Sequence, residues 1–250
     1  MRRAGAASDL PHHIYGLHPV AAALRNPERR RRHLLATANA LRRLAALDAR
    51  PDVPVEEVDA GRLTRQLGGD AVHQGCLLFC EPLPERTLDD MISARRLVAL
   101  DQVTDPHNVG AVLRSCAGFA VDGLIVTARN SPRETPVLAK SAAGAIDYVP
   151  MLRVRNLANA LQALTRAGVI TVGLEAGSPH TLEACALREP FALVLGAEGK
   201  GLRQRTQAVC ERLAGLALPG RMPSLNVSNA AAVALYVADR TVREGGEGRN

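Results

Sequence analysis

Polar and glycine residues gather in three segments of the chain, each directly after a short apolar run. The segments are 97–126, 191–202 and 216–240. Continuous apolar runs of this length are typical of strands buried in a parallel sheet. In open α/β sheets, ligands bind at the carboxyl ends of the strands. The chemistry that these segments could perform therefore begins with holding a small molecule against backbone groups.

The third segment, LALPGRMPSLNVSNAAAVALYVADR at 216–240, is the most informative. Residues 216–218 are expected to form a short strand, and the prolines and glycine that follow predict an irregular loop. Ser224, Asn226 and Ser228 precede a run of small and apolar residues that predicts a helix. Ser and Asn cap helix N-termini, which also attract anions. An ordinary capped helix would explain Ser228 alone, whereas the whole segment favours a ligand-binding loop.

Composition limits the possible classes of protein. The chain has 250 residues, is 47% hydrophobic and has no uninterrupted apolar stretch long enough for a transmembrane helix. Five cysteines without a CxxC pair favour reduced thiols in a cytoplasmic protein, as does a first segment without the apolar region of a signal peptide. Ten arginines against three acids in residues 1–50 permit nucleic-acid binding. An aromatic content of 2% with no Trp argues against a base-stacking platform.

Two α/β domains are expected, joined by a linker. Residues 14–80 alternate between strand and helix patterns and predict a small domain, while the two prolines of 81–93 predict a stiff linker. Residues 94–243 predict a parallel sheet with helices on both of its faces. The segments 1–13 and 244–250 are expected to be flexible tails. The six strands of the larger sheet are expected at 97–101, 123–127, 148–153, 168–174, 190–195 and 213–218.

Familiar nucleotide and metal motifs are missing from the sequence. No GxGxxG follows a predicted strand, and GAEGKG at 196–201 lacks the Ser or Thr that a phosphate-binding loop carries after its lysine. No HExxH or EF-hand spacing indicates a metal centre. Asp101 and Asp105 could suggest magnesium, but Asp105 followed by proline is explained more simply as a turn.

Three motifs carry a family resemblance. DPHNVGAVLRS at 105–115, LVLGAEGKGL at 193–202 and LPGRMPSLNVSNAAAVALY at 218–236 resemble, in order and spacing, the motifs of the SpoU/TrmH family. Members of that family are RNA 2′-O-ribose methyltransferases of the SPOUT superfamily. YGLHPVAAAL at 15–24 and AVHQG at 71–75 resemble the N-terminal RNA-binding domain of its ribosomal-RNA branch, which modifies a 23S guanosine.

The resemblance implies a fold, a cofactor and partners. It implies a C-terminal domain with a deep trefoil knot, preceded by a small RNA-binding domain, and a homodimer formed through the knotted domains. It implies S-adenosyl-L-methionine as cofactor, held largely by backbone, and RNA as substrate, with no membrane partner. The positions that it assigns to the cofactor are Leu195, Gly196, Leu216, Leu218, Gly220 and Leu225.

The resemblance also assigns catalytic positions, which are Asn108, Arg114, Glu198, Ser224 and Asn226. A guanidinium hardly deprotonates in a protein, so we expect Arg114 to bind the adjacent phosphate and stabilise the forming alkoxide instead of acting as a base. Asn108 is expected to begin the helix of the first motif, and Glu198 to orient Arg114 or Asn226. Ser224 and Asn226 are expected to shape the cofactor and ribose pocket.

Three other functions compete with methylation of ribosomal RNA. The first is ribose methylation of transfer RNA, which the N-terminal domain makes less favoured. The second is a non-catalytic RNA-binding protein of ribosome assembly on the same fold, which the complete set of catalytic positions disfavours. The third is an ordinary nucleotide-dependent enzyme, which the missing glycine fingerprint disfavours.

Overall fold

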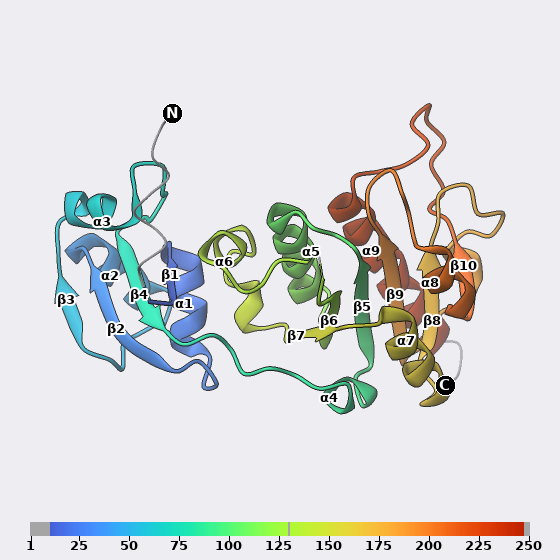
Figure 1. Ribbon diagram of the computed structural model, residues 1–250, viewed down its shortest axis with the longest axis horizontal. Helices are drawn as coiled ribbons and strands as arrows, with labels where there is room; N and C mark the ends of the chain where they lie inside the picture. Colours follow the sequence, from blue (N-terminus) through green and yellow to red (C-terminus); the bar gives the residue numbers. More distant parts are fainter. Residues whose placement is uncertain (1–10, 130, 248–250) are drawn as a thin grey trace. The chain divides into compact units, whose positions relative to one another are not determined.

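The computed structural model describes residues 11–129 and 131–247, which fall into two compact units (Figure 1). The first unit comprises Met1–Pro84 and Arg133–Tyr148, and the second comprises Glu85–Pro132 and Val149–Asn250. The sequence assigned 133–148 to the larger domain, but these residues pack into the core of the smaller one. Ala139 is part of that core, and a Cβ atom at Gly144 would lie 2.7 Å from the Cβ of Ala22.

The first unit is a four-stranded sheet in the order β1-β4-β2-β3, and helices pack on both of its faces. Only β2 and β3 pair in parallel. The strand β1 and the helix α3 were not predicted. The elements are β1 (His13–Tyr15), α1 (Leu17–Arg25), β2 (Arg31–Ala36), α2 (Ala38–Ala46), β3 (Val55–Glu57), α3 (Ala60–Leu67), β4 (Cys76–Cys80), α6 (Pro136–Ser141) and the 3-10 helix η1 (Ala145–Asp147).

The two faces of this sheet carry different side chains, because successive strand residues point to opposite sides. Ile14, Leu34 and Leu78 face the main core, which also holds residues of α1 and α2. Leu35 and Leu77 face the other way and pack with α3. The main core is therefore closed by helices on one face, and α3 supplies a smaller cluster on the other.

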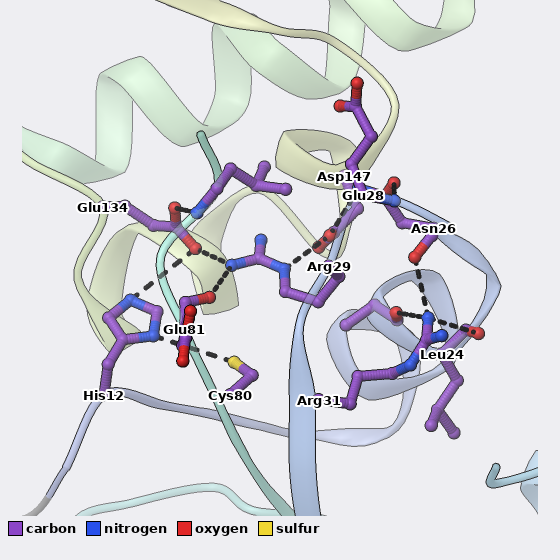
Figure 2. Close-up of polar contacts among 12 residues, drawn as sticks. His12, Leu24, Asn26, Glu28, Arg29, Arg31, Cys80, Glu81, Glu134 and Asp147 are labelled. Atoms are coloured by element: carbon purple, nitrogen blue, oxygen red, sulfur yellow. Dashed lines mark hydrogen bonds and ion pairs between the residues drawn. The ribbon is translucent and has the colours of Figure 1, made fainter. Parts of the chain in front are cut away.

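A buried arginine joins the inserted segment to the rest of the first unit. The side chain of Arg29 is 0% exposed; its Nε donates to Asp147 Oδ1 at 2.9 Å, and its Nη1 donates to the carbonyl of Glu81 and pairs with Glu134. Figure 2 shows the guanidinium between Glu134 and Asp147. Burial alone would lower the pKa of Arg29, but the Asp147 and Glu134 carboxylates hold it above its ordinary value. The charged pair therefore persists inside the unit.

Replacing Arg29 by methionine should lower the free energy of unfolding of the first unit by about 3–5 kcal/mol, because two carboxylates lose their buried partner. Chemical denaturation of the full-length protein would measure the loss. Arg30, the next residue, has an 84% exposed side chain. Arg30→Met is the matched control and should change stability by less than about 0.5 kcal/mol. Equal losses in the two variants would contradict a specific role for the buried charge.

The second unit is a six-stranded, fully parallel sheet in the order β10-β8-β9-β5-β6-β7. This confirms the predicted parallel α/β architecture. The elements are α4 (Asp89–Ile92), β5 (Arg96–Asp101), α5 (Pro106–Gly118), β6 (Gly123–Thr127), β7 (Met151–Val154), α7 (Leu157–Arg166), β8 (Ile170–Leu174), the 3-10 helix η2 (Glu183–Cys185), β9 (Phe191–Gly196), α8 (Gln204–Val209), β10 (Arg212–Ala214) and α9 (Val227–Glu247).

Helices cover both faces of the larger sheet, as predicted. Leu97 and Ala99 of β5 pack with residues of α7 and α8 on one face. Val98 and Leu100 alternate with them, are 0% exposed and point to the opposite face, where α5 and α9 pack together. Buried positions on both sides explain why β5 is a continuous apolar run.

Several predicted boundaries were wrong. The strand expected through 218 ends at Ala214, because Gly215 bonds to a loop, with its N–H donating to the carbonyl of His180 at 2.8 Å. The linker expected at 81–93 contains α4, and the tail expected from 244 is helical as far as Glu247. The tail expected at 1–13 lies mostly outside the described residues, and its last residue begins β1.

Two further observations concern chemistry and environment. All five cysteines lie in the described part of the chain and carry free thiols. No helix in that part is both long and apolar enough to cross a membrane.

Candidate functional site

A cavity of about 470 Å³ lies at the carboxyl ends of β8 and β9, which is where the sequence placed a ligand. Its walls come from the ends of these strands, from the loop after β10 and from the start of α9. Eight of the predicted site residues line it. They are Leu195, Gly196, Glu198, Leu216, Leu218, Ser224, Leu225 and Asn226.

The floor of the cavity depends on a tight turn after β9. Gly196 pairs with Asp101 in the sheet, and the N–H of Gly201 donates to the carbonyl of Ala197 at 2.8 Å. A Cβ atom at Gly196 would lie only 2.0 Å from the carbonyl carbon of Gly201. Gly196 is therefore required by close backbone approach, and Gly201, at φ +61°, also favours glycine.

Asp101 fixes the far end of the same turn. Its side chain is buried, and its carboxylate accepts from the backbone N–H of Arg203 at 3.1 Å and from Arg203 Nε at 2.8 Å. Asp101 is thus the ion-pair partner of Arg203. Burial, together with the Asp101 carboxylate, raises the pKa of the Cys210 thiol to about 12, so this thiol is not a nucleophile at neutral pH.

Three predicted catalytic residues meet at the rim of the cavity. Glu198 Oε1 accepts from Asn108 Nδ2 at 3.4 Å, from the N–H of Val227 at 3.4 Å and from Asn226 Nδ2. Asn226 Nδ2 also donates to Asn108 Oδ1 at 3.2 Å. This polar cluster of Asn108, Glu198 and Asn226 joins all three sequence motifs. Of the two partners considered for Glu198, the structure provides Asn226.

Asn226 also begins the last helix. Its Oδ1 accepts from the N–H of Ser228 at 2.9 Å and from Ser228 Oγ at 2.6 Å. Asp105 has the same role at α5, where its carboxylate accepts from the N–H of His107 at 2.9 Å. Asp105 is therefore the cap of α5, where the sequence predicted a turn. The expectation that Asn108 begins this helix was wrong, because Asn108 lies within its first turn. The side chain of Asn226 both caps α9 and holds the polar cluster.

Three predicted site residues are not among the described residues that line the cavity. Asn108 reaches only its rim, through its hydrogen bonds with Glu198 and Asn226, and the other two are Arg114 and Gly220. Arg114 is exposed on α5 and is not among the lining residues. Gly220 does not line the cavity either, has no positive φ, and no described atom lies within 4 Å of a Cβ placed there. The backbone requires glycine instead at Gly196, through close approach, and at Gly201, through its positive φ.

Sequence reasoning missed one acidic residue of the cavity. Glu175 lines the wall directly after β8, and its Oε1 accepts from Gln207 Nε2 at 3.1 Å. The signal that could have identified it was its position immediately after the strand predicted at 168–174. The cavity thus combines leucines on its walls with two carboxylates, Glu175 and Glu198.

Comparison with known sequences gives two family matches. The pattern of the SpoU rRNA Methylase family matches residues 95–236, and that of RNA 2′-O ribose methyltransferase substrate binding matches residues 13–86. A protein of Vibrio cholerae, named 23S rRNA (guanosine-2′-O-)-methyltransferase RlmB, is 36% identical over 91% of this chain and 96% of its own length. An uncharacterized tRNA/rRNA methyltransferase of Synechocystis is 37% identical over 89% of this chain, which spans 61% of that relative.

Solved structures share the fold. The SpoU methyltransferase AviRb from Streptomyces viridochromogenes, crystallised in complex with the cofactor AdoMet, superposes with a TM-score of 0.76 at 24% identity, covering 91% of this chain and 89% of AviRb. A family match over more than half of the sequence agrees with the three motifs that meet at the cavity. This chain belongs to the SpoU rRNA methylase family.

Proposed function

We propose that this protein is an S-adenosylmethionine-dependent RNA methyltransferase that modifies the ribose 2′-hydroxyl of a guanosine in 23S ribosomal RNA. The observation that carries the proposal is the polar cluster, because Asn108, Glu198 and Asn226 come from three distant motifs and meet beside one cavity. The names of full-length relatives support the reaction and the substrate.

The residues of the cavity suit an adenosine-bearing cofactor. Its volume of about 470 Å³ is in the range of small-molecule sites, and its walls are mostly apolar residues and glycines, five of them leucines, with few polar side chains. Leu195, Leu216 and Leu218 would hold the flat adenine ring between apolar surfaces, with neighbouring backbone groups reaching its polar edge. When bound, S-adenosylmethionine supplies an electrophilic methyl group.

The residues of this chain bind and orient the RNA and stabilise the charge that develops during transfer. Arg114 binds the phosphate next to the target ribose and stabilises the negative charge that develops on its 2′-oxygen. Asn108 and Asn226 orient that ribose, while Glu198 holds the two amides in place. Ser224, on the cavity wall, closes the pocket beside the reacting centre. Alignment of the methyl group with the ribose 2′-oxygen can lower the barrier by up to about 7–11 kcal/mol.

We further propose that the second unit is knotted and dimeric. After β10 the chain pairs with an earlier loop, since the N–H of Leu182 donates to the carbonyl of Gly215 at 2.9 Å, and α9 then packs back against α5 and β9. This path supports a trefoil knot. On α9, Val233 and Tyr236 are 40% and 54% exposed, which supports an interface with a second copy.

We assign RNA binding to the first unit and the cytoplasm as the location. The family match of residues 13–86 and the excess of arginine in residues 1–50 support the first assignment. The five free thiols support the second assignment, because the cytoplasm keeps thiols reduced and also contains the ribosomal RNA.

Calorimetry is the direct test of the cofactor, and we expect S-adenosylhomocysteine to bind while NAD and ATP do not. Mapping of ribose methylation in RNA from a deletion strain should then show one guanosine of 23S RNA that has lost its methyl group. Binding of NAD or ATP without binding of S-adenosylhomocysteine would reject the proposed reaction. Loss of a methyl group from transfer RNA instead of 23S RNA would reject the proposed substrate.

A further inference from the structure

Four rings lie together on the face of the first sheet that α3 partly covers. His13 and His33 both lie directly opposite Phe79 in the antiparallel pairing of β1, β4 and β2. The ring centroids of His13 and Phe79 are 6.3 Å apart, and those of Phe79 and His33 are 6.1 Å apart. Tyr15 lies beside them, 6.4 Å from His13. We refer to His13, Tyr15, His33 and Phe79 as the ring row.

One end of the ring row is closed and the other is open. Leu35 and Leu77, on the same face, are almost fully buried and pack with Leu63 of α3. At the other end, Phe79 is half-buried and the side chain of His33 is 37% exposed, and their rings are nearly parallel, with an interplanar angle of 9°. The open end therefore presents flat ring surface that the small cluster under α3 does not cover completely.

Positive charge lies next to this open end. The pairing of β2 with β4 shifts register between Arg31 and His33, which leaves Arg32 as the extra residue of a bulge, and its side chain is 62% exposed. Arg32 Nη2 donates to Glu81 at 2.8 Å, and Arg30 pairs with the same carboxylate at 3.8 Å. Two exposed guanidiniums thus share one carboxylate, which leaves one positive charge in excess there. Glu56 lies 3.9 Å from His33 Nε2, but this carboxylate is itself paired with Arg62.

We propose that Phe79 and His33 form a stacking site for an unpaired base of the RNA substrate, with Arg30 and Arg32 binding the adjoining phosphates. Single-stranded RNA is recognised by stacking on exposed rings and by cations along its backbone. The low aromatic content of the sequence argued against a stacking platform, but two of its six Tyr and Phe residues, Tyr15 and Phe79, lie together in the ring row. A single base needs only one such exposed ring surface. The proposal rests on the RNA-binding role of the first unit proposed above.

The test uses the full-length protein and two RNA probes, an oligoadenylate decamer and a duplex of ten base pairs, in fluorescence anisotropy over a series of salt concentrations. Phe79→Leu keeps an apolar side chain in the cluster, and His33→Ala changes a partly exposed residue. Each should weaken binding of the decamer about tenfold, leave its salt dependence unchanged and leave duplex binding unchanged. Arg32→Ala should instead reduce the slope of log affinity against log salt by about one for both probes.

The matched control is Tyr148→Ala, because Tyr148 is an aromatic residue of the same unit, is 54% exposed and lies outside the ring row. It should bind both probes as the unchanged protein does. If the unchanged protein binds the decamer and neither Phe79→Leu nor His33→Ala weakens that binding, the stacking site is wrong while the RNA-binding role stands. If the unchanged protein binds neither probe at low salt, both are overturned, whereas binding of S-adenosylhomocysteine would still support the cofactor site.

Discussion

Arg114→Ala should abolish methyl transfer, with kcat falling at least about 100-fold, while the Kd for S-adenosylmethionine stays within about twofold. Arg114 is exposed on α5 and is not among the described residues that line the cofactor cavity. We expect its planar guanidinium to contribute charge and geometry in the transition state. Single-turnover transfer to ribosomal RNA and calorimetry with the cofactor measure the two quantities separately.

Two variants sharpen this result. Arg114→Lys keeps the charge but loses the two-pronged guanidinium, so it should retain a small part of the activity. Arg166→Ala removes an arginine from α7 on the opposite face of the sheet, where its Nε donates to the carbonyl of Gln162 at 3.2 Å, and should be fully active. A parallel loss of cofactor affinity and activity in Arg114→Ala would show that Arg114 holds the cofactor instead of the RNA.

Gly196→Ala should destroy the cofactor cavity. The new Cβ would lie 2.0 Å from the carbonyl carbon of Gly201 and 2.3 Å from the nitrogen of Leu202, and both are backbone atoms that cannot rotate away. The turn must shift, and the turn supplies both a cavity wall and Glu198. We expect affinity for S-adenosylhomocysteine to fall more than tenfold, which is about 1.4 kcal/mol, with a loss of stability of about 1–3 kcal/mol.

Gly220→Ala is the matched control for this change. No described atom lies within 4 Å of a Cβ at Gly220, and the residue has no positive φ, so binding should be unchanged. Calorimetry measures the cofactor affinity of both variants, and thermal melting measures their stability. Loss of affinity in Gly220→Ala, with the melting temperature maintained, would return Gly220 to the cofactor site, where the sequence had placed it.

The sequence predicted the larger sheet well because its strands are buried on both faces. The runs expected at 97–101 and 123–127 coincide with β5 and β6 to within one residue. The smaller unit was harder. The strand β1 has three residues, which is too short for a period to be recognised. The helix α3 is amphipathic, with Leu63 and Leu67 packing on the same cluster, but a pattern of eight residues with two leucines is short enough to be overlooked.

The site was predictable in position but not in its contacts. Motif spacing located Asn108, Glu198 and Asn226, yet their hydrogen bonds join residues 90, 28 and 118 positions apart, and no local pattern encodes such distances. The same limit applies to Arg29, which is the first of four consecutive arginines and has no local sign of burial. Its partners Glu134 and Asp147 follow 105 and 118 residues later.

This separation also affects the order in which a ribosome can produce the molecule. When residue 84 has left the exit tunnel, Arg29 is present but the carboxylates that neutralise it have not been translated. The first unit can complete its core only after β6 and the residues as far as Asp147 have emerged, so it cannot finish folding before part of the second unit has been synthesised. A nascent chain stalled before residue 134 would expose the unpaired Arg29 cation and an unfinished apolar core, and exposed apolar surface of this kind is what chaperones bind.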